Sequence, residues 1–172
     1  LLLGAWWILS PARHTHTITA DAGIKDVTLD DGTRIWLRGG ATLEYSNDYN
    51  KKNRNVSLAG EAFFDVAHNT SLPFTIDAAN TVVQVVGTSF SVNTGNNQVA
   101  LTVKRGRVSF SAASNPSNKI LVTAGEKALY ADNNLEKEIN SNENFNAWQS
   151  KQLIFINTPL KQVTEDLNNC YG

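Results

Sequence analysis

The sequence is poor in the residue types that build disulfides, metal sites and nucleic-acid interfaces. Its 172 residues include one cysteine, three histidines and no methionine. The single cysteine, Cys170, excludes an internal disulfide framework and a cysteine-rich metal site. Acidic and basic residues nearly balance, with a net charge of −1, and we interpret the main basic cluster, Lys51–Arg54, as a solvated turn. We therefore expect no nucleic acid among the partners.

Residue patterns typical of metal binding and nucleophilic catalysis are incomplete. His14 and His16 have a ligand-like spacing, but no third ligand lies near them in the sequence. His68 falls in a predicted turn, where we expect it to face water. The stretch Gly87–Ser91 begins like a nucleophile elbow, yet its last residue is serine where that motif needs glycine. This stretch is therefore predicted to be a turn between strands.

Paired carboxylates do not complete an active site either. Glu61 and Asp65 are four residues apart and would lie on one side of a strand, but nothing else indicates a sugar-cleaving cleft. Asp30–Gly32 lacks the further acids of a calcium loop and is better explained as a hairpin turn. We therefore expect no enzyme activity, no catalytic or metal-binding residue and no cofactor.

The first nine residues, 1–9, carry no charge. A transmembrane helix needs about 20 such residues, so this run fits the exit half of a span, and its two adjacent tryptophans suit a membrane boundary. Two alternatives stay open. Ser10–Ala12 has the form of a signal-peptidase site, which would make the run the end of a signal peptide, or the run could be a buried core segment. We expect residues 1–12 to end a transmembrane helix and residues 13–21 to form a linker.

From residue 22 to residue 131, apolar and polar residues alternate with the period of half-buried strands. Asp30–Thr33 places an Asp-Gly pair between two such runs, which favours a hairpin. About ten short runs follow one another at spacings near ten residues, separated by turns. The pattern predicts a mainly β domain over 22–131, with a jelly-roll or sandwich-like fold or a short β-helix.

The composition changes after residue 131. Residues 132–147 are polar and rich in asparagine, as expected of a linker. Within 148–172, Leu153–Asn157 is predicted to be a strand and Thr158–Pro159 the start of a helix. That helix would place three apolar residues on one face: Leu160, Val163 and Leu167. Since one strand and one helix cannot bury a core alone, we expect 148–172 to be the truncated start of a small α/β domain.

A series of different short motifs runs along the chain, and each is a turn flanked by apolar residues. Its most informative positions are Asp31, Gly32, Gly60, Glu61, Phe64, Val66, Pro73, Phe74, Gly87, Thr88, Phe90, Gly106 and Gly125. In this order, and with the tail that starts at Trp148, the set resembles the periplasmic region of FecR-type sigma regulators. Each motif alone is weak, but the ordered set covers nearly the whole chain.

The resemblance implies signalling and not catalysis. Proteins of this kind are anti-sigma factors that cross the bacterial inner membrane once, which would place residues 13–172 in the periplasm and residues 1–9 in the membrane. A missing N-terminal domain would hold an extracytoplasmic-function sigma factor in the cytoplasm. The signalling domain of a TonB-dependent outer-membrane transducer would contact the C-terminal region. The signal would then cross the membrane, commonly with proteolysis of the regulator.

Two predictions follow for the surfaces that bind partners. On the signalling hypothesis, the expected contact residues lie in the tail: Leu153, Phe155, Ile156 and Leu160. The alternative is a secreted carbohydrate-binding or adhesion module, in which Trp36, Tyr45 and Tyr49 would supply exposed aromatic rings. Trp36 is more simply explained by packing on the second face of its own strand.

Overall fold

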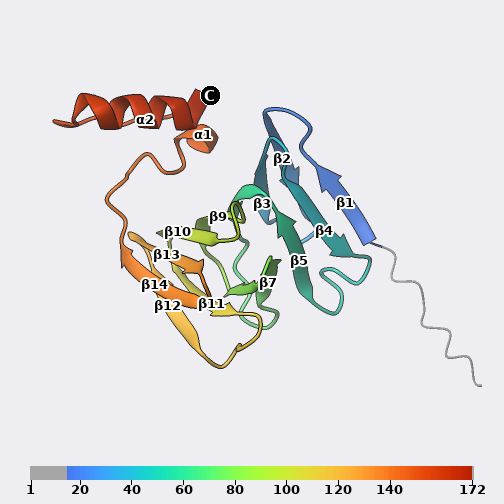
Figure 1. The fold of residues 1–172 in the computed structure, drawn as a ribbon. Helices are drawn as coiled ribbons and strands as arrows, with labels where there is room; N and C mark the ends of the chain where they lie inside the picture. The colour runs from blue at the N-terminus through green and yellow to red at the C-terminus, as the bar shows by residue number, and fades with distance from the viewer. Residues whose placement is uncertain (1–14, 172) are drawn as a thin grey trace, which may run out of the picture.

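The computed structural model describes residues 15–171, which form fourteen strands and two helices (Figure 1). The predicted end of a transmembrane helix (1–12) and His14 lie outside the described residues. The first sheet contains, in spatial order, β1 (Thr15–Thr19), β4 (Thr42–Ser46), β5 (Arg54–Ala59), β7 (Phe74–Ala78), β8 (Thr81–Val85), β11 (Arg107–Ala112) and β12 (Lys119–Thr123). The second contains β14 (Asn134–Ile139), β13 (Glu126–Ala131), β10 (Val99–Arg105), β9 (Ser89–Asn93), β6 (Glu61–Asp65), β3 (Arg34–Arg38) and β2 (Ile24–Thr28).

The two sheets pack as a sandwich, and the chain passes repeatedly from one to the other. The hairpins β2–β3 and β9–β10 belong to the second sheet, and the hairpin β7–β8 between them in the sequence belongs to the first. All strand pairs except β5–β7 are antiparallel. The predicted mainly β, sandwich-like fold is confirmed, with fourteen strands where about ten were expected. The hairpin predicted at Asp30–Thr33 is the β2–β3 turn.

The core lies between the sheets and is built by the period-two pattern. In β5, the residues from Arg54 to Ala59 alternate strictly between buried and exposed positions. Phe64 contributes its ring from the second sheet, where it stacks on Phe90 with centroids 5.4 Å apart and meets Phe74 of the first sheet at 6.1 Å. Aromatic pairs at these separations add to the stability from buried area.

Glycines occupy corners where the chain changes sheet. Gly60 connects β5 to β6 with a φ of +94°, a conformation that L side chains rarely adopt. A Cβ at this position would also lie 2.8 Å from the Cα of Ala41. The tight passage from one sheet to the other therefore requires glycine here.

Both ends of the sandwich are closed by a lysine that joins the edge strands of the two sheets. At one end, Lys25 of β2 donates from Nζ to the carbonyl of Thr19 in β1 (2.9 Å). At the other end, Lys137 of β14 donates to the carbonyl of Leu121 in β12 (3.1 Å). Charged side chains on edge strands oppose pairing with another chain. The sandwich thus presents protected edges.

Strands extend into both stretches for which the sequence predicted linkers. Thr15–Thr19, within the expected linker 13–21, forms β1 and pairs with β4 over five residues. Asn134–Ile139, within the expected linker 132–147, forms β14 and pairs with β13. The linker interpretation is wrong for these residues. An edge strand buries few side chains, so both sequences carry little apolar alternation.

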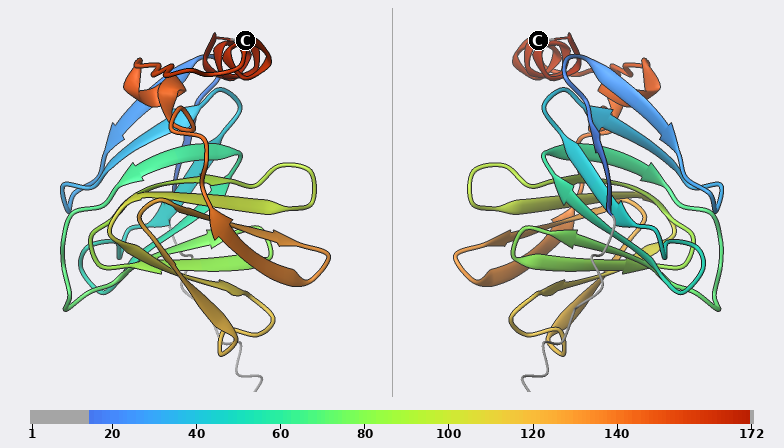
Figure 2. Two further views of the ribbon diagram at one scale, coloured as in Figure 1. Left: turned by 90° about the vertical axis from the view of Figure 1, so that its left-hand side faces the viewer. Right: turned by 90° about the vertical axis from the view of Figure 1, so that its right-hand side faces the viewer.

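The C-terminal segment, residues 140–171, leaves β14 and crosses to the opposite end of the sandwich. There α1 (Ala147–Ser150) and α2 (Leu160–Tyr171) lie near β2 and β3, as both views of Figure 2 show. The strand predicted at Leu153–Asn157 is wrong, because this stretch has no partner strand among the described residues. Within residues 15–171, no helix has both the length and the apolar character to cross a membrane.

Candidate functional site at the junction of the sandwich and the C-terminal segment

Arg54 is fully buried and organises one side of the sandwich. Its Nη1 lies 2.9 Å from Oδ2 of Asp31 and donates to the carbonyl of Ala67 at 2.8 Å. The same guanidinium donates to the carbonyls of Leu72 and Asn69 at 2.6 and 3.2 Å. Such a buried charge is tolerated because each of the three guanidinium nitrogens donates to at least one acceptor. The prediction that Lys51–Arg54 is a solvated turn is therefore wrong at its last residue.

The sequence did contain a signal for this burial. Arg54 is in phase with Val56 and Leu58, which occupy the buried face of β5. Its partner Asp31 is held by the main-chain N–H of Thr33 at 3.0 Å. Burial acts to raise the pKa of Asp31, but the hydrogen bonds from Thr33 and Arg54 outweigh it and keep that pKa below its ordinary value.

The motif residues that carry the family resemblance have structural positions. Asp31 belongs to the buried ion pair, and Thr88 is buried and donates from Oγ1 to the carbonyl of Arg107 (2.9 Å). Pro73 directly precedes β7. Four of the motif residues are apolar and belong to the core: Phe64, Val66, Phe74 and Phe90. Five others are glycines at turns and corners: Gly32, Gly60, Gly87, Gly106 and Gly125.

The two carboxylates that the sequence places on one side of a strand, Glu61 and Asp65, are engaged separately. Glu61 forms an ion pair with Arg38 (3.1 Å), whereas Asp65 pairs with Arg105 (3.0 Å) and accepts a hydrogen bond from Ser89 (2.6 Å). Each carboxylate thus has its own basic partner on the outer face of the second sheet. Across residues 15–171, no group of three or more His, Cys, Asp or Glu side chains is placed to hold a metal ion.

Arg38 joins the sandwich to the C-terminal segment. From the end of β3, its guanidinium pairs with Glu61, donates to the main-chain carbonyl of Asn169 in α2, and lies 5.8 Å from the ring centre of Trp148 in α1. Trp148 is itself buried. One side chain therefore contacts a strand and both helices, so displacement of the helices would break its contacts.

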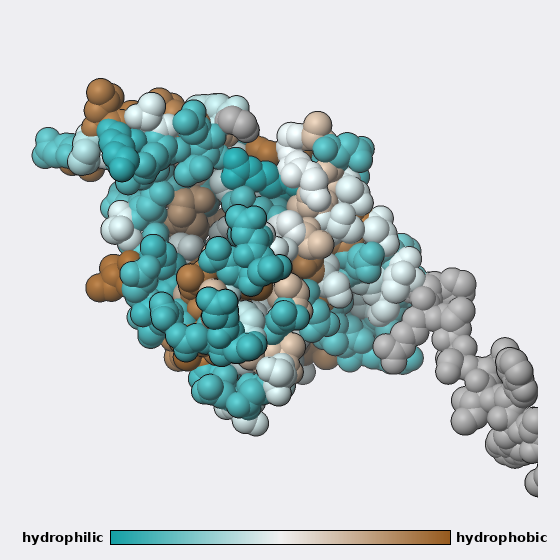
Figure 3. Space-filling model, in the orientation of Figure 1, coloured by the Kyte–Doolittle hydropathy of each residue, from teal (hydrophilic) through white to brown (hydrophobic). Residues whose placement is uncertain are grey.

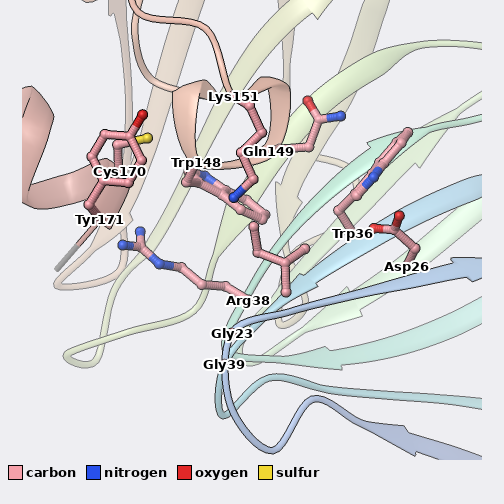
Figure 4. A pocket seen from close by; sticks show the side chains of 11 residues that line it. Gly23, Asp26, Trp36, Arg38, Gly39, Trp148, Gln149, Lys151, Cys170 and Tyr171 are labelled. Carbon is pink, nitrogen blue, oxygen red and sulfur yellow. The ribbon is translucent and has the colours of Figure 1, made fainter.

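A cavity of about 900 Å³ opens beside Arg38 (Figure 4). Figure 4 shows Trp36 and Asp26 on the sandwich side, with Lys151 and Tyr171 on the side of the C-terminal segment. Its lining mixes aromatic and charged groups of both signs. The cavity shows that the helices touch the sandwich through a few side chains and leave open space beside them.

A polar clasp, made by Asn142, Asn144, Gln162 and Asp166, holds the C-terminal segment together. The carboxylate of Asp166 in α2 is 3% exposed and accepts from the amides of Asn142 (3.1 Å), Asn144 (2.8 Å) and Gln162 (2.9 Å). No basic side chain among residues 15–171 pairs with it. This clasp was not predicted, because the asparagines were assigned to a linker. Their alternation from Asn140 to Asn146 was the available signal.

The C-terminal segment also exposes apolar side chains. Ile156 and Leu160 are 77% and 81% exposed, Phe155 is 38% exposed, and Leu153 is partly buried. Figure 3 shows hydrophobic surface along α2. We define the apolar tail surface as the exposed residues Ile154, Phe155, Ile156, Leu160, Leu167 and Tyr171. Three of the four predicted contact residues belong to it, and their role stays a prediction.

The aromatic residues proposed for sugar binding do not form a common platform. Tyr49 is 3% exposed, and burial, followed by the charge of Asp31, raises its pKa well above the ordinary value. Trp36 lies in the second sheet and packs edge-on against Phe63, with centroids 5.9 Å apart, while Tyr45 lies in the first sheet. The second-face packing expected of Trp36 is thus confirmed, and the three rings cannot stack on one ligand.

The two-sheet sandwich with its C-terminal helical segment defines a mainly β protein. The model of the family described as FecR protein matches residues 16–126, and the chain belongs to the FecR family. Two crystal structures of a candidate anti-sigma factor from Parabacteroides distasonis are similar, each with 28% sequence identity. The match to the first structure has a TM-score of 0.73 and covers 92% of this chain and 75% of the matched chain. The match to the second has a TM-score of 0.72 and covers 91% of this chain and 74% of the matched chain. A comparison with curated proteins gave no match.

Proposed function

We propose that this chain is the sensor-side part of a membrane-tethered anti-sigma factor. Membership of the FecR family supports a regulatory role, and both similar crystal structures are of a candidate anti-sigma factor. In this proposal residues 1–9 lie in the inner membrane and residues 13–172 lie in the periplasm. A domain outside this sequence holds an extracytoplasmic-function sigma factor in the cytoplasm.

The input comes from the signalling domain of a TonB-dependent outer-membrane transducer, which binds the C-terminal segment. The observation that carries this proposal is the apolar tail surface, with Ile156 and Leu160 almost fully exposed. Exposed apolar residues gathered on one surface mark interaction sites in soluble domains. The sandwich edges are closed by Lys25 and Lys137, so the C-terminal segment is the favoured place for a partner.

The sandwich acts as a rigid spacer between the membrane and the contact site. Its seven-stranded sheets and continuous core resist bending. Arg38 ties α2 to β3, so a partner that moves the helices acts on the sandwich through this one guanidinium. The relay therefore consists of a contact element on a stiff support.

Co-purification with the sigma factor tests the regulatory role. The complete reading frame would be expressed with the sigma factor encoded beside it, and the regulator would be captured by a tag. We expect the sigma factor to be retained, and to be lost when the region before residue 1 is deleted. A complete frame with no cytoplasmic region, or no capture of the sigma factor, would contradict the proposal.

A further inference from the structure

The four edge strands of the two sheets are attached to the sandwich in different ways. β2, β12 and β14 each belong to a hairpin, in which a turn keeps the edge strand beside its partner. β1 is different, because its partner β4 is separated from it in the chain by β2 and β3, which lie in the other sheet. Detachment of β1 therefore opens no turn of the sandwich.

The side chains of β1 add little to the bonds of its backbone. Four of its five residues are exposed, and the fifth, Ile18, is only partly buried against the core. His16 stacks on Tyr45 with ring centroids 5.1 Å apart, but it is itself exposed. Within residues 15–171, no ion pair joins β1 to another strand, whereas Lys127 and Glu138 join β13 to β14 at 3.0 Å. Segments with few buried apolar contacts open without unfolding of the whole domain.

Ala20 marks the end of this weakly held strand. It is 1% exposed, its N–H donates to the carbonyl of Ala41 (2.9 Å), and its carbonyl accepts from the N–H of Gly40 (2.7 Å). The neighbouring carbonyl of Thr19 is held by Lys25. The chain thus changes within two residues from an exposed strand to a buried residue with both main-chain groups bonded. Opening that begins at the start of β1 should therefore stop at Ala20.

We propose that β1 detaches from β4 as a unit and thereby lengthens the tether between the membrane and the sandwich. This inference rests on the proposed function, in which residues 1–9 lie in the inner membrane. With β1 in place, the five residues 10–14 span at most about 18 Å. With β1 detached, the ten residues 10–19 span up to about 36 Å, and Ala20 is the fixed point. The reach of the sandwich from the membrane then roughly doubles, while its core stays intact.

Residue-level amide exchange on the full-length protein in lipid nanodiscs tests the detachment. We expect the β1 amides that bond to β4 to exchange at least about tenfold faster than the amides that join β5 to β7. The change from fast to slow exchange should fall at Ala20, whose N–H is bonded to Ala41. Equal protection of β1 and of the β5–β7 pair would overturn the proposal, because β1 would then open only with the whole sandwich.

Retention in the nanodisc separates this proposal from the proposed function. A protein that the nanodisc does not retain would overturn the membrane anchor, and the tether with it. A protein that is retained, but whose β1 is as protected as the central strands, would overturn the detachment alone and leave the proposed function standing.

Ile18→Ala and Thr17→Ala form a matched pair within β1. The first removes the one side chain of β1 that packs against the core, so exchange of the β1 amides should become about tenfold faster while the β5–β7 amides are unchanged. The second changes an exposed side chain, and exchange should change by less than about threefold. Equal effects of the two variants, or faster exchange in β5 and β7 as well, would contradict an opening limited to β1.

A disulfide staple tests the change in length. Thr17 and Glu44 lie opposite each other in register, so Thr17→Cys with Glu44→Cys, in a Cys170→Ser background, joins β1 to β4 when oxidised. Lys127→Cys with Glu138→Cys is the matched control, because these residues are also opposite each other and join β13 to β14. The control staple leaves β1 free.

Both stapled proteins would be pulled between the nanodisc and the C-terminus in a single-molecule force measurement. In the reduced state we expect a reversible lengthening of up to about 18 Å before the sandwich unfolds. Oxidation of the staple between β1 and β4 should remove this step, and oxidation of the control staple should leave it. A step that persists with β1 stapled, or no step in the reduced protein, would overturn the extensible tether.

Discussion

The sandwich and the C-terminal segment distribute polar and apolar groups in opposite ways. In the sandwich, phenylalanines fill the interior, and the buried guanidinium of Arg54 is paired with a carboxylate. In the C-terminal segment, the carboxylate of Asp166 is buried among neutral amides while Ile156 and Leu160 are exposed. The first arrangement stabilises a fold by itself. The second holds a shape whose apolar surface is available to a partner.

This contrast separates stability from binding. Substitutions in the sandwich should change the free energy of unfolding, whereas substitutions on the apolar tail surface should change partner binding with little effect on the fold. The predictions below test that separation.

The largest effect is expected for Arg54→Ala. The substitution leaves the Asp31 carboxylate and three carbonyls without their buried donor, which should destabilise the sandwich by about 3–5 kcal/mol. Urea unfolding would measure the loss. Lys52→Ala is the matched control, because Lys52 lies in the same turn and forms an exposed ion pair with Asp48; it should cost at most about 0.5 kcal/mol. Similar losses in both would show that Arg54 is not buried.

Gly60→Ala is expected to have the second largest effect on stability. It should lower the free energy of unfolding by about 2–4 kcal/mol, because alanine would have to adopt a positive φ and its Cβ would lie against Ala41. Gly125→Ala shares the positive φ but has open space around its Cβ position, and should cost about 1 kcal/mol. Thermal or urea unfolding of both variants gives the difference. An equal loss in the two would mean that the corner at Gly60 is not tight.

Acid should weaken the sandwich through Asp31 and Glu126. Hydrogen bonds from the Thr123 N–H, then from Lys137, lower the pKa of Glu126 to about 2. Each of these carboxyl groups has a lower pKa in the folded state than in the unfolded state, so its ionised form stabilises the fold. That stabilisation is complete above a pH of about 4.5 and is lost as the pH falls toward about 2. Glu126→Gln should flatten the dependence of the urea midpoint on pH across this window. An unchanged slope would exclude Glu126 as its source.

Arg38→Ala should cost the sandwich only about 1 kcal/mol, because the ion pair with Glu61 is partly exposed. Its larger effect should be on α2, which loses the bond from Arg38 to Asn169. Faster amide exchange in α2, with unchanged exchange in the β3 and β6 amides, would be the expected result. Uniformly faster exchange would indicate general destabilisation and would contradict a role limited to the junction.

Ile156→Asp should change stability least, by at most about 0.5 kcal/mol, because the side chain is 77% exposed. If the apolar tail surface binds the transducer, the same substitution should abolish measurable binding of its signalling domain to the full-length protein. Asn168→Asp offers a control at an exposed position of α2 that is not part of this surface. Normal binding by an Ile156→Asp variant that is correctly folded would contradict the proposed contact.

The fold was predictable where apolar residues alternate strongly, and less so at the edges. The hairpin at Asp30–Thr33 and the shared face of Ala62 and Phe64 follow directly from period-two spacing. The edge strands β1 and β14 were missed because edge positions bury little and need no apolar pattern. A strand was predicted at Leu153–Asn157 from its composition, but strand formation also depends on a partner, which local sequence does not reveal.

The candidate site was only partly predictable for a similar reason. Phe155, Ile156 and Leu160 are conspicuous as apolar residues in a polar tail, and the structure exposes them. Arg38 and Asp166 act through contacts with residues distant in the sequence, such as Asn169 and Asn142. Local composition carries no information about such contacts.

The position of Cys170 gives the junction a chemical probe of its own. Cys170 is 9% exposed and lines the cavity beside Arg38 and Trp148, and the sequence has no other cysteine and no methionine. A thiol-specific reagent can therefore reach sulfur at only one place in the chain, and reaches it fully only when α2 moves from the sandwich. The rate of alkylation then reports the opening of the junction directly, without an introduced label.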